Sequence, residues 1–244
     1  MAQTRTSSTK KVKRASKPAR PAARSKPAAV PFDIEDDEPT AMVLRACGIA
    51  RDSVFNVRDF LADNSRMAFL AIKECEKELD QIERKIDELL PDAITRVGEV
   101  KARQLLACLK FITDLERIGD LSYSAVMQLQ ARRDKLPAED SRQLIEMATL
   151  LHGMLDQVHH GFEKREVSYA RDVLQTDPEV DRICHALFQR HLAENRDGSK
   201  HFDILLTAQA LERIGDHAKN LAEELYSLAE GRSLRHNAKK PSSN

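Results

Sequence analysis

Tryptophan is absent from this sequence, and aromatic residues of all kinds make up only 5% of its 244 residues. Because strands are enriched in aromatic and β-branched residues, this scarcity disfavours sandwiches and barrels, whereas abundant Leu, Ala, Glu, Lys and Arg favour helices. No run approaches the roughly 18 consecutive apolar residues of a transmembrane helix, and the N-terminus lacks the apolar core of a secretory signal. The four cysteines are widely spaced and form no Cys-x-x-Cys pair, which fits a reduced compartment. We therefore expect a soluble, cytoplasmic, all-α protein.

Proline is also sparse, since only Pro91, Pro137 and Pro178 interrupt the chain between Pro39 and its last residues. Few helix breaks predict long helices. We predict six, over residues 41–62, 64–90, 95–133, 140–165, 167–194 and 200–230. The periodicity is clearest in the second, where apolar residues recur in steps of three and four at Ile72, Cys75, Leu79, Ile82, Ile86 and Leu89. One stripe of this helix should face a core.

Acidic residues are missing from residues 1–29, which hold nine of the 39 basic residues. Such a segment has too little apolar surface to offset the entropy of ordering it, so we predict a disordered tail, basic and then acidic, over residues 1–39. An organellar transit peptide would share this composition, but the Lys-Pro and Arg-Pro steps disfavour its amphipathic helix. We expect one three-helix bundle at 40–136, a second at 137–232 and a flexible tail at 233–244.

An internal repeat supports this division. The pentapeptide Glu-Arg-Ile-Gly-Asp occurs at residues 116–120 and again at 212–216, each time after an apolar helical segment. Because chance seldom repeats five residues, duplication is the simplest explanation. Short connections favour antiparallel neighbours, so the predicted fold is all-α, with two tandem, pseudo-symmetric three-helix bundles made of six long antiparallel helices.

The repeats carry acidic pairs at a spacing of four residues, in the pentapeptides and in the helices before them. Residues four apart lie on one helix face, and in an antiparallel bundle the acidic flanks of neighbouring helices can converge. The candidate metal ligands are Glu76, Asp80, Glu116 and Asp120 in the first half and Asp177, Asp181, Glu212 and Asp216 in the second. Clustered carboxylates suit hard cations and also bind iron; iron, magnesium, manganese, calcium and zinc all stay open. Solvated helix surface is the ordinary explanation for one such pair, but it explains four matched pairs poorly.

Two further residue types recur in both pentapeptides. Gly119 and Gly215 suggest close helix approach or access to the carboxylates, although a packing role explains them equally well. Arg117 and Arg213 would neutralise nearby carboxylates or bind a phosphate-like anion, and we favour neutralisation. Adjacent histidines at 159 and 160, and His217, are assigned no metal role.

From about residue 41 to residue 232 the sequence resembles the PhoU family, whose members consist of two similar three-helix bundles with E/DxxxD motifs. The resemblance rests on ERIGDHAKNLAEE at 212–224 and on Asp177, Val180, Asp181 and Ile183, with Glu76, Leu79, Asp80, Ile82 and Glu83 before the first ERIGD copy. The departures are the basic tail, Glu76 where the other half has Asp177, and Ser124 where it has Asn220.

The resemblance implies a non-enzymatic regulator that lowers phosphate uptake and the phosphate-starvation response through metal-linked binding to other proteins. The implied partners are the ATPase subunit of the phosphate ABC transporter and a sensor histidine kinase. It further implies a homodimer, peripheral membrane association through the transporter, and no specific nucleic acid. The alternatives are a metal-dependent all-α nucleotide pyrophosphatase and a non-catalytic helical scaffold. A ferritin-like di-iron bundle is excluded because Glu-x-x-His occurs nowhere in the sequence.

Overall fold

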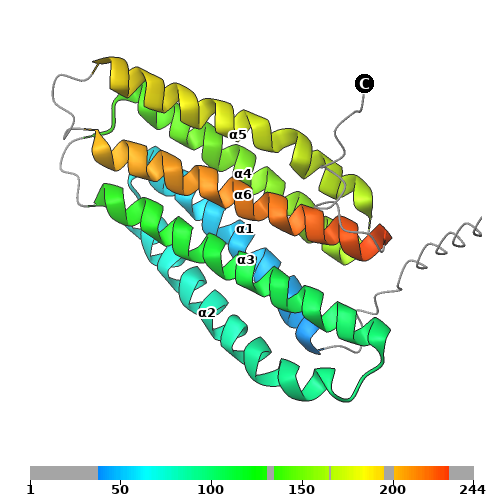
Figure 1. Cartoon of the computed structure of the whole chain (residues 1–244). Helices are drawn as coiled ribbons and strands as arrows, with labels where there is room; N and C mark the ends of the chain where they lie inside the picture. Colours follow the sequence, from blue (N-terminus) through cyan, green and yellow to red (C-terminus); the bar gives the residue numbers. More distant parts are fainter. Residues whose placement is uncertain (1–37, 131–134, 165, 195–200, 231–244) are drawn as a thin grey trace, which may run out of the picture.

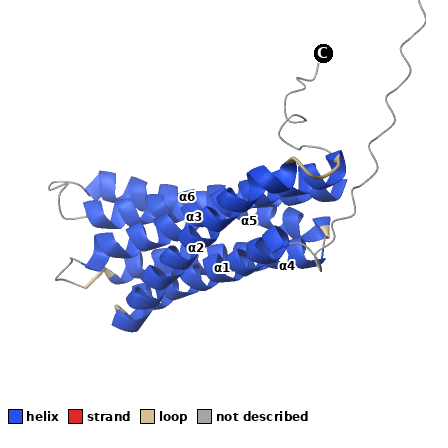
Figure 2. Ribbon diagram, turned by 90° about the horizontal axis from the view of Figure 1, so that it is seen from below, coloured by secondary structure: helices blue, strands red, loops and turns tan. Residues whose placement is uncertain are grey.

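The computed structural model describes residues 38–130, 135–164, 166–194 and 201–230, and in these ranges the chain forms helices and no strand (Figures 1 and 2). The helices are α1 (Glu38–Asp63), α2 (Arg66–Ile94), α3 (Glu99–Gln130), α4 (Ala138–Lys164), α5 (Val167–Glu194) and α6 (Phe202–Glu230). The predicted all-α fold of six long helices is confirmed. Both tails expected from the sequence lie outside the described residues, except that α1 already begins at Glu38.

The helices form two bundles of three, and the bundles lie side by side. Helices α1, α2 and α3 pack on one another, as do α4, α5 and α6. The bundles meet where α1 packs on α4 and α3 packs on α6, which leaves α2 and α5 on opposite edges of the molecule (Figure 1). The duplicated sequence therefore builds a pseudo-symmetric pair, in which the acidic helices α2 and α5 are the outer ones.

A single apolar core runs through both bundles. Buried residues from all six helices belong to one contiguous cluster. It includes the buried thiols of Cys47, Cys108 and Cys184, which form no disulfide, and burial raises the pKa of the Cys47 thiol to about 12. The inward stripe of α6 is buried along Ala208, Leu211, Ile214, Ala218, Leu221 and Leu225. The division into domains at residues 136 and 137 stays a prediction.

The C-terminal end of α2 differs from the sequence-based expectation. Pro91 was expected to mark a break, but it lies inside α2, which continues to Ile94. Proline has no N–H, so the carbonyl of Asp87 receives no backbone hydrogen bond from residue 91. Asp87 is exposed, so water can donate to this carbonyl instead. Leu89 was expected in the apolar stripe, yet it is 37% exposed while Leu90 is 4% exposed. The step from Ile72 to Leu90 is about five full helical turns, so Leu90 returns to the face of Ile72.

No described helix is long and apolar enough to cross a membrane.

Candidate functional site

The first predicted cluster lies where α2 packs against α3. The pKa of Glu116 is raised to about 7, first by burial and then by the negative charges of Asp120 and Glu83. The pKa of Glu76 is also raised, first by burial and then by Asp120 and Asp80. Glu76 and Asp80 come from α2 and Glu116 and Asp120 from α3, and a Cβ atom on Gly119 would lie only 3.6 Å from Glu76 Cα, so the acidic flanks of the two helices converge.

The side chain of Glu116 is less exposed than those of Asp80 and Asp120. Its side chain is 12% exposed, and its Oε2 atom is buried without a hydrogen-bond partner. Arg117 Nε lies 3.4 Å from that oxygen, and Arg117 Nη1 lies 3.1 Å from Asp120 Oδ2. On the other helix, Arg84 Nη2 lies 2.8 Å from Asp80 Oδ2. Both arginines are more than half exposed, so water screens these pairs and they neutralise the cluster only partly.

The second predicted cluster lies between α5 and α6 and has a different neutralising group. Burial and then the charges of Asp177 and Asp216 raise the pKa of Asp181. Burial and then Asp216, Asp181 and Asp177 raise that of Glu212. Asp177 is buried and accepts a hydrogen bond of 2.6 Å from Lys219 Nζ. The sequence had suggested Arg213 for neutralisation, but Arg213 is exposed and Lys219 supplies the ammonium inside this cluster.

The two repeated glycines lie at these clusters, and the helices approach them unequally. A Cβ atom on Gly119 would meet Leu79 Cδ1 at 2.7 Å and Glu76 Cα at 3.6 Å. A Cβ atom on Gly215 would meet Leu151 Cδ2 at 3.4 Å and Asp177 Oδ1 at 3.7 Å, which are ordinary contact distances. Close helix approach therefore explains the glycine of the first cluster better than that of the second.

Gly119→Ala is expected to lower the free energy of unfolding by up to about 2 kcal/mol. Overpacking against the fully buried Leu79 costs roughly 1–3 kcal/mol, of which the better helix propensity of alanine returns about 1 kcal/mol. The repeat supplies its own control, because Gly215→Ala adds the same methyl group without a clash and is expected to be neutral or to stabilise by up to about 1 kcal/mol. Urea denaturation followed by circular dichroism measures both. Equal changes in the two variants would contradict the packing explanation.

The carboxylates gather in each cluster without forming a closed set of ligands. Among the described residues, no three of the eight bring oxygens within 4.8 Å of one another. The donor chemistry and the buried Glu116 Oε2, which has no hydrogen-bond partner, fit a cation, but the side chains must turn inward to hold it. Which of the eight residues bind metal therefore stays a prediction.

One group of possible ligands in the described residues is closer together, and the sequence did not indicate it. Asp140, His191 and His201 each offer a ligand atom, and these atoms all lie within 4.8 Å of one another. No local spacing reveals them, because they come from three different helix ends. His217, which was assigned no metal role, lies with Nδ1 at 2.8 Å from Asp114 Oδ1 across the α3–α6 contact. His159 Nδ1 lies 3.3 Å from Arg51 Nη1.

Comparisons with known proteins agree with the repeat. A domain family described as "PhoU domain" matches residues 43–129 and again residues 144–225. The phosphate-specific transport system accessory protein PhoU homologue of Rhizobium meliloti is 28% identical over 208 residues, covering 82% of this chain and 87% of that protein. The homologue of the same name from Caulobacter vibrioides is 30% identical over 204 residues, covering 80% and 88%.

Two crystal structures have a similar fold. PhoU from Pseudomonas aeruginosa matches with a TM-score of 0.71 at 24% identity, over 80% of this chain and 97% of that one. The phosphate transport system regulatory protein PhoU from Streptococcus pneumoniae matches with a TM-score of 0.70 at 22% identity, over 81% and 96%. The likeness thus extends over both three-helix bundles.

Proposed function

Because this chain belongs to the PhoU family, we propose that it regulates phosphate uptake and the phosphate-starvation response by binding other proteins, without catalysing a reaction. The observation that carries the proposal is the double match to the PhoU domain, one copy on each bundle. The similar proteins are named as accessory or regulatory proteins of phosphate transport. A helical surface with two acidic clusters suits the recognition of other proteins.

The binding is proposed to be linked to a metal cation in each acidic cluster. Burial and then neighbouring carboxylate charges raise the pKa of Glu76 and Glu116 in the first cluster and of Asp181 and Glu212 in the second, and a cation would relieve that repulsion. Oxygen donors favour hard cations such as magnesium, calcium or manganese, and iron and zinc are further candidates. The first cluster is the stronger candidate, because Tyr123 stands at the position equivalent to Lys219, so the ammonium that donates to Asp177 has no counterpart at that position.

The proposed partners are the ATPase subunit of the phosphate ABC transporter and a sensor histidine kinase. Both present their soluble parts in the cytoplasm, so the chain would act there, as a homodimer that reaches the membrane through the transporter. A cation held at an outer helix pair is well placed to alter such contacts, because α2 and α5 form the free edges of the molecule (Figure 1).

A pull-down from the native host tests this function. The tagged full-length chain should capture the transporter ATPase and the kinase from cells grown in high phosphate, and the recovery should change in low phosphate. The double variant Glu76→Gln, Asp80→Asn should recover less of both partners, because it removes half of the first cluster. The control is Glu74→Gln, Glu78→Gln, which removes two charges at the same spacing on α2 from pairs with Lys77 and Arg45. Absence of both partners under every condition would refute the proposal, and equal recovery by the two variants would refute its link to metal.

A further inference from the structure

Three helix ends meet at one end of the second bundle. Asp140 lies in the first turn of α4, His191 lies in the last turn of α5, and His201 immediately precedes α6. The antiparallel order of these helices places an N-terminus, a C-terminus and another N-terminus together there (Figure 1). The site is separate from the second carboxylate cluster, because Asp177 lies 14 residues before His191 on α5, about 21 Å along the helix.

The polar groups at this end are deeply buried and incompletely paired. Asp140 is 2% exposed and His191 is 6% exposed. His191 Nε2 lies 2.9 Å from Asp140 Oδ1, and the rings of His191 and His201 lie 4.7 Å apart between centroids. The Nδ1 atoms of both histidines are buried without a hydrogen-bond partner. A buried polar atom without a hydrogen-bond partner costs about 1–3 kcal/mol. Two such atoms on adjacent rings therefore indicate a ligand-binding site.

We propose that Asp140, His191 and His201 bind one divalent transition-metal ion, with zinc as the best fit. Two imidazoles and one carboxylate are a ligand set that zinc and its neighbours accept, and three protein ligands leave one position open for water. Their ligand atoms already lie within 4.8 Å of one another, without contributions from residues elsewhere in the chain. The ion would hold the ends of α4, α5 and α6 together through two imidazole nitrogens, whereas the eight candidate ligands of the two acidic clusters are all carboxylates.

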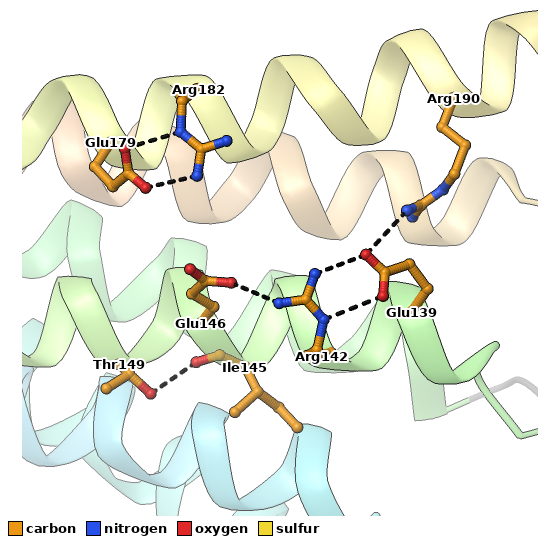
Figure 3. Close-up of polar contacts among 8 residues, drawn as sticks. All are labelled: Glu139, Arg142, Ile145, Glu146, Thr149, Glu179, Arg182 and Arg190. Atoms are coloured by element: carbon orange, nitrogen blue, oxygen red, sulfur yellow. Dashed lines mark hydrogen bonds and ion pairs between the residues drawn. The ribbon is translucent and has the colours of Figure 1, made fainter.

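One neighbouring cation has to be accommodated. Arg190 contacts Asp140 Oδ1 through Nη2, and its Nη1 atom lies 3.7 Å from Glu139 Oε1. Figure 3 shows Arg190 reaching from α5 to Glu139 on α4, where Glu139 also pairs with Arg142. Glu139 therefore offers Arg190 an acidic partner when Asp140 turns to the ion.

Cobalt titration of the purified full-length chain tests the proposal, because Co²⁺ bound by imidazole at a four-coordinate site has a strong visible absorption that six-coordinate oxygen sites lack. The expected result is a visible band that saturates with one Co²⁺ per chain and disappears when Zn²⁺ is added. His201→Gln should weaken this binding by about tenfold or more, since even residues that only support a ligand are worth that much. His191→Gln should abolish the band.

Two controls keep the test specific. His217→Gln removes a histidine that also pairs with an aspartate, Asp114, but has no third ligand nearby, and it should leave the band unchanged. Glu212→Gln with Asp216→Asn should leave the band unchanged as well. No band in the wild-type chain, or an unchanged Co²⁺ affinity in a His201→Gln protein with wild-type circular dichroism, would overturn the proposal. Since His201 is only partly buried, this variant decides the matter even if His191→Gln fails to fold.

Discussion

Replacement of Phe111 by alanine is expected to lower the free energy of unfolding by about 3–5 kcal/mol, the usual cost of truncating a fully buried phenylalanine. Phe111 of α3 is completely buried, and its ring centroid lies 4.8 Å from that of Phe162 in α4. The contact therefore joins the first bundle to the second. For a chain of this size each kcal/mol corresponds to about 2–4 °C, so the melting temperature should fall by roughly 6–20 °C.

The same variant should keep one cooperative transition, because the buried residues of both bundles form one contiguous core. Thermal and urea denaturation followed by helical circular dichroism measure the midpoint and the number of transitions. Phe202→Ala is the matched control, since Phe202 is 60% exposed and its loss should change stability by no more than about 0.5 kcal/mol. Two transitions, with only one displaced by Phe111→Ala, would mean that the bundles unfold independently despite their shared core.

The fold could be predicted from the sequence because its signals are local and repeated. Steps of three and four between apolar residues and the scarcity of proline indicated long helices, and two ERIGD copies 96 residues apart indicated duplication. The prediction was wrong at the C-terminal end of α2, where single residues determine how far the helix extends and which face is buried. Pro91 lies inside α2 near an exposed carbonyl, and Leu90 replaces Leu89 in the stripe because the helix repeat is 3.6 residues, so a stripe written in steps of three and four drifts.

The candidate sites could be predicted only as far as helix faces determine them. Carboxylates four residues apart share a face, so their gathering at α2–α3 and α5–α6 follows from local spacing once the helices pack. Lys219 was missed, because its contact with Asp177 spans two helices and lies outside the acidic motif. Asp140, His191 and His201 were missed for the same reason, since they come from three different helix ends and no short motif records their meeting.

Cation binding to the first carboxylate cluster is expected to tighten as the pH rises from about 5 to 8. The pKa of Glu116 is about 7 in the folded chain, against an ordinary value of 4.5, chiefly because the carboxyl is buried. Between pH 4.5 and about pH 7, Glu116 of the folded chain holds a proton that it has lost in the unfolded chain. Its contribution to stability is thus fully present below pH 4.5 and is lost as the pH rises through 7.

A cation needs Glu116 ionised, so below about pH 7 binding must displace this proton, and affinity for the first cluster should fall about tenfold for each pH unit. Calorimetric titration of the metal-free chain at several pH values measures the affinity and the protons released. Glu116→Gln should remove this proton release and make the metal-free chain more stable at pH 8. Glu78→Gln is the control, because it removes one exposed charge from α2 that pairs with Arg45 outside the cluster.

The second cluster supplies an internal comparison for the same measurement. A cation present at a hundred times its dissociation constant stabilises the fold by about 2.7 kcal/mol, or roughly 5–10 °C in the melting temperature. Glu212→Gln with Asp216→Asn should lower the number of bound cations by one while the proton release from Glu116 persists, because that residue belongs to the other bundle. Chelator should reverse the stabilisation in the wild-type chain. Full metal content in this double variant would show that the second cluster is surface charge, and equal affinity at pH 5 and pH 8 would show that Glu116 is not a ligand.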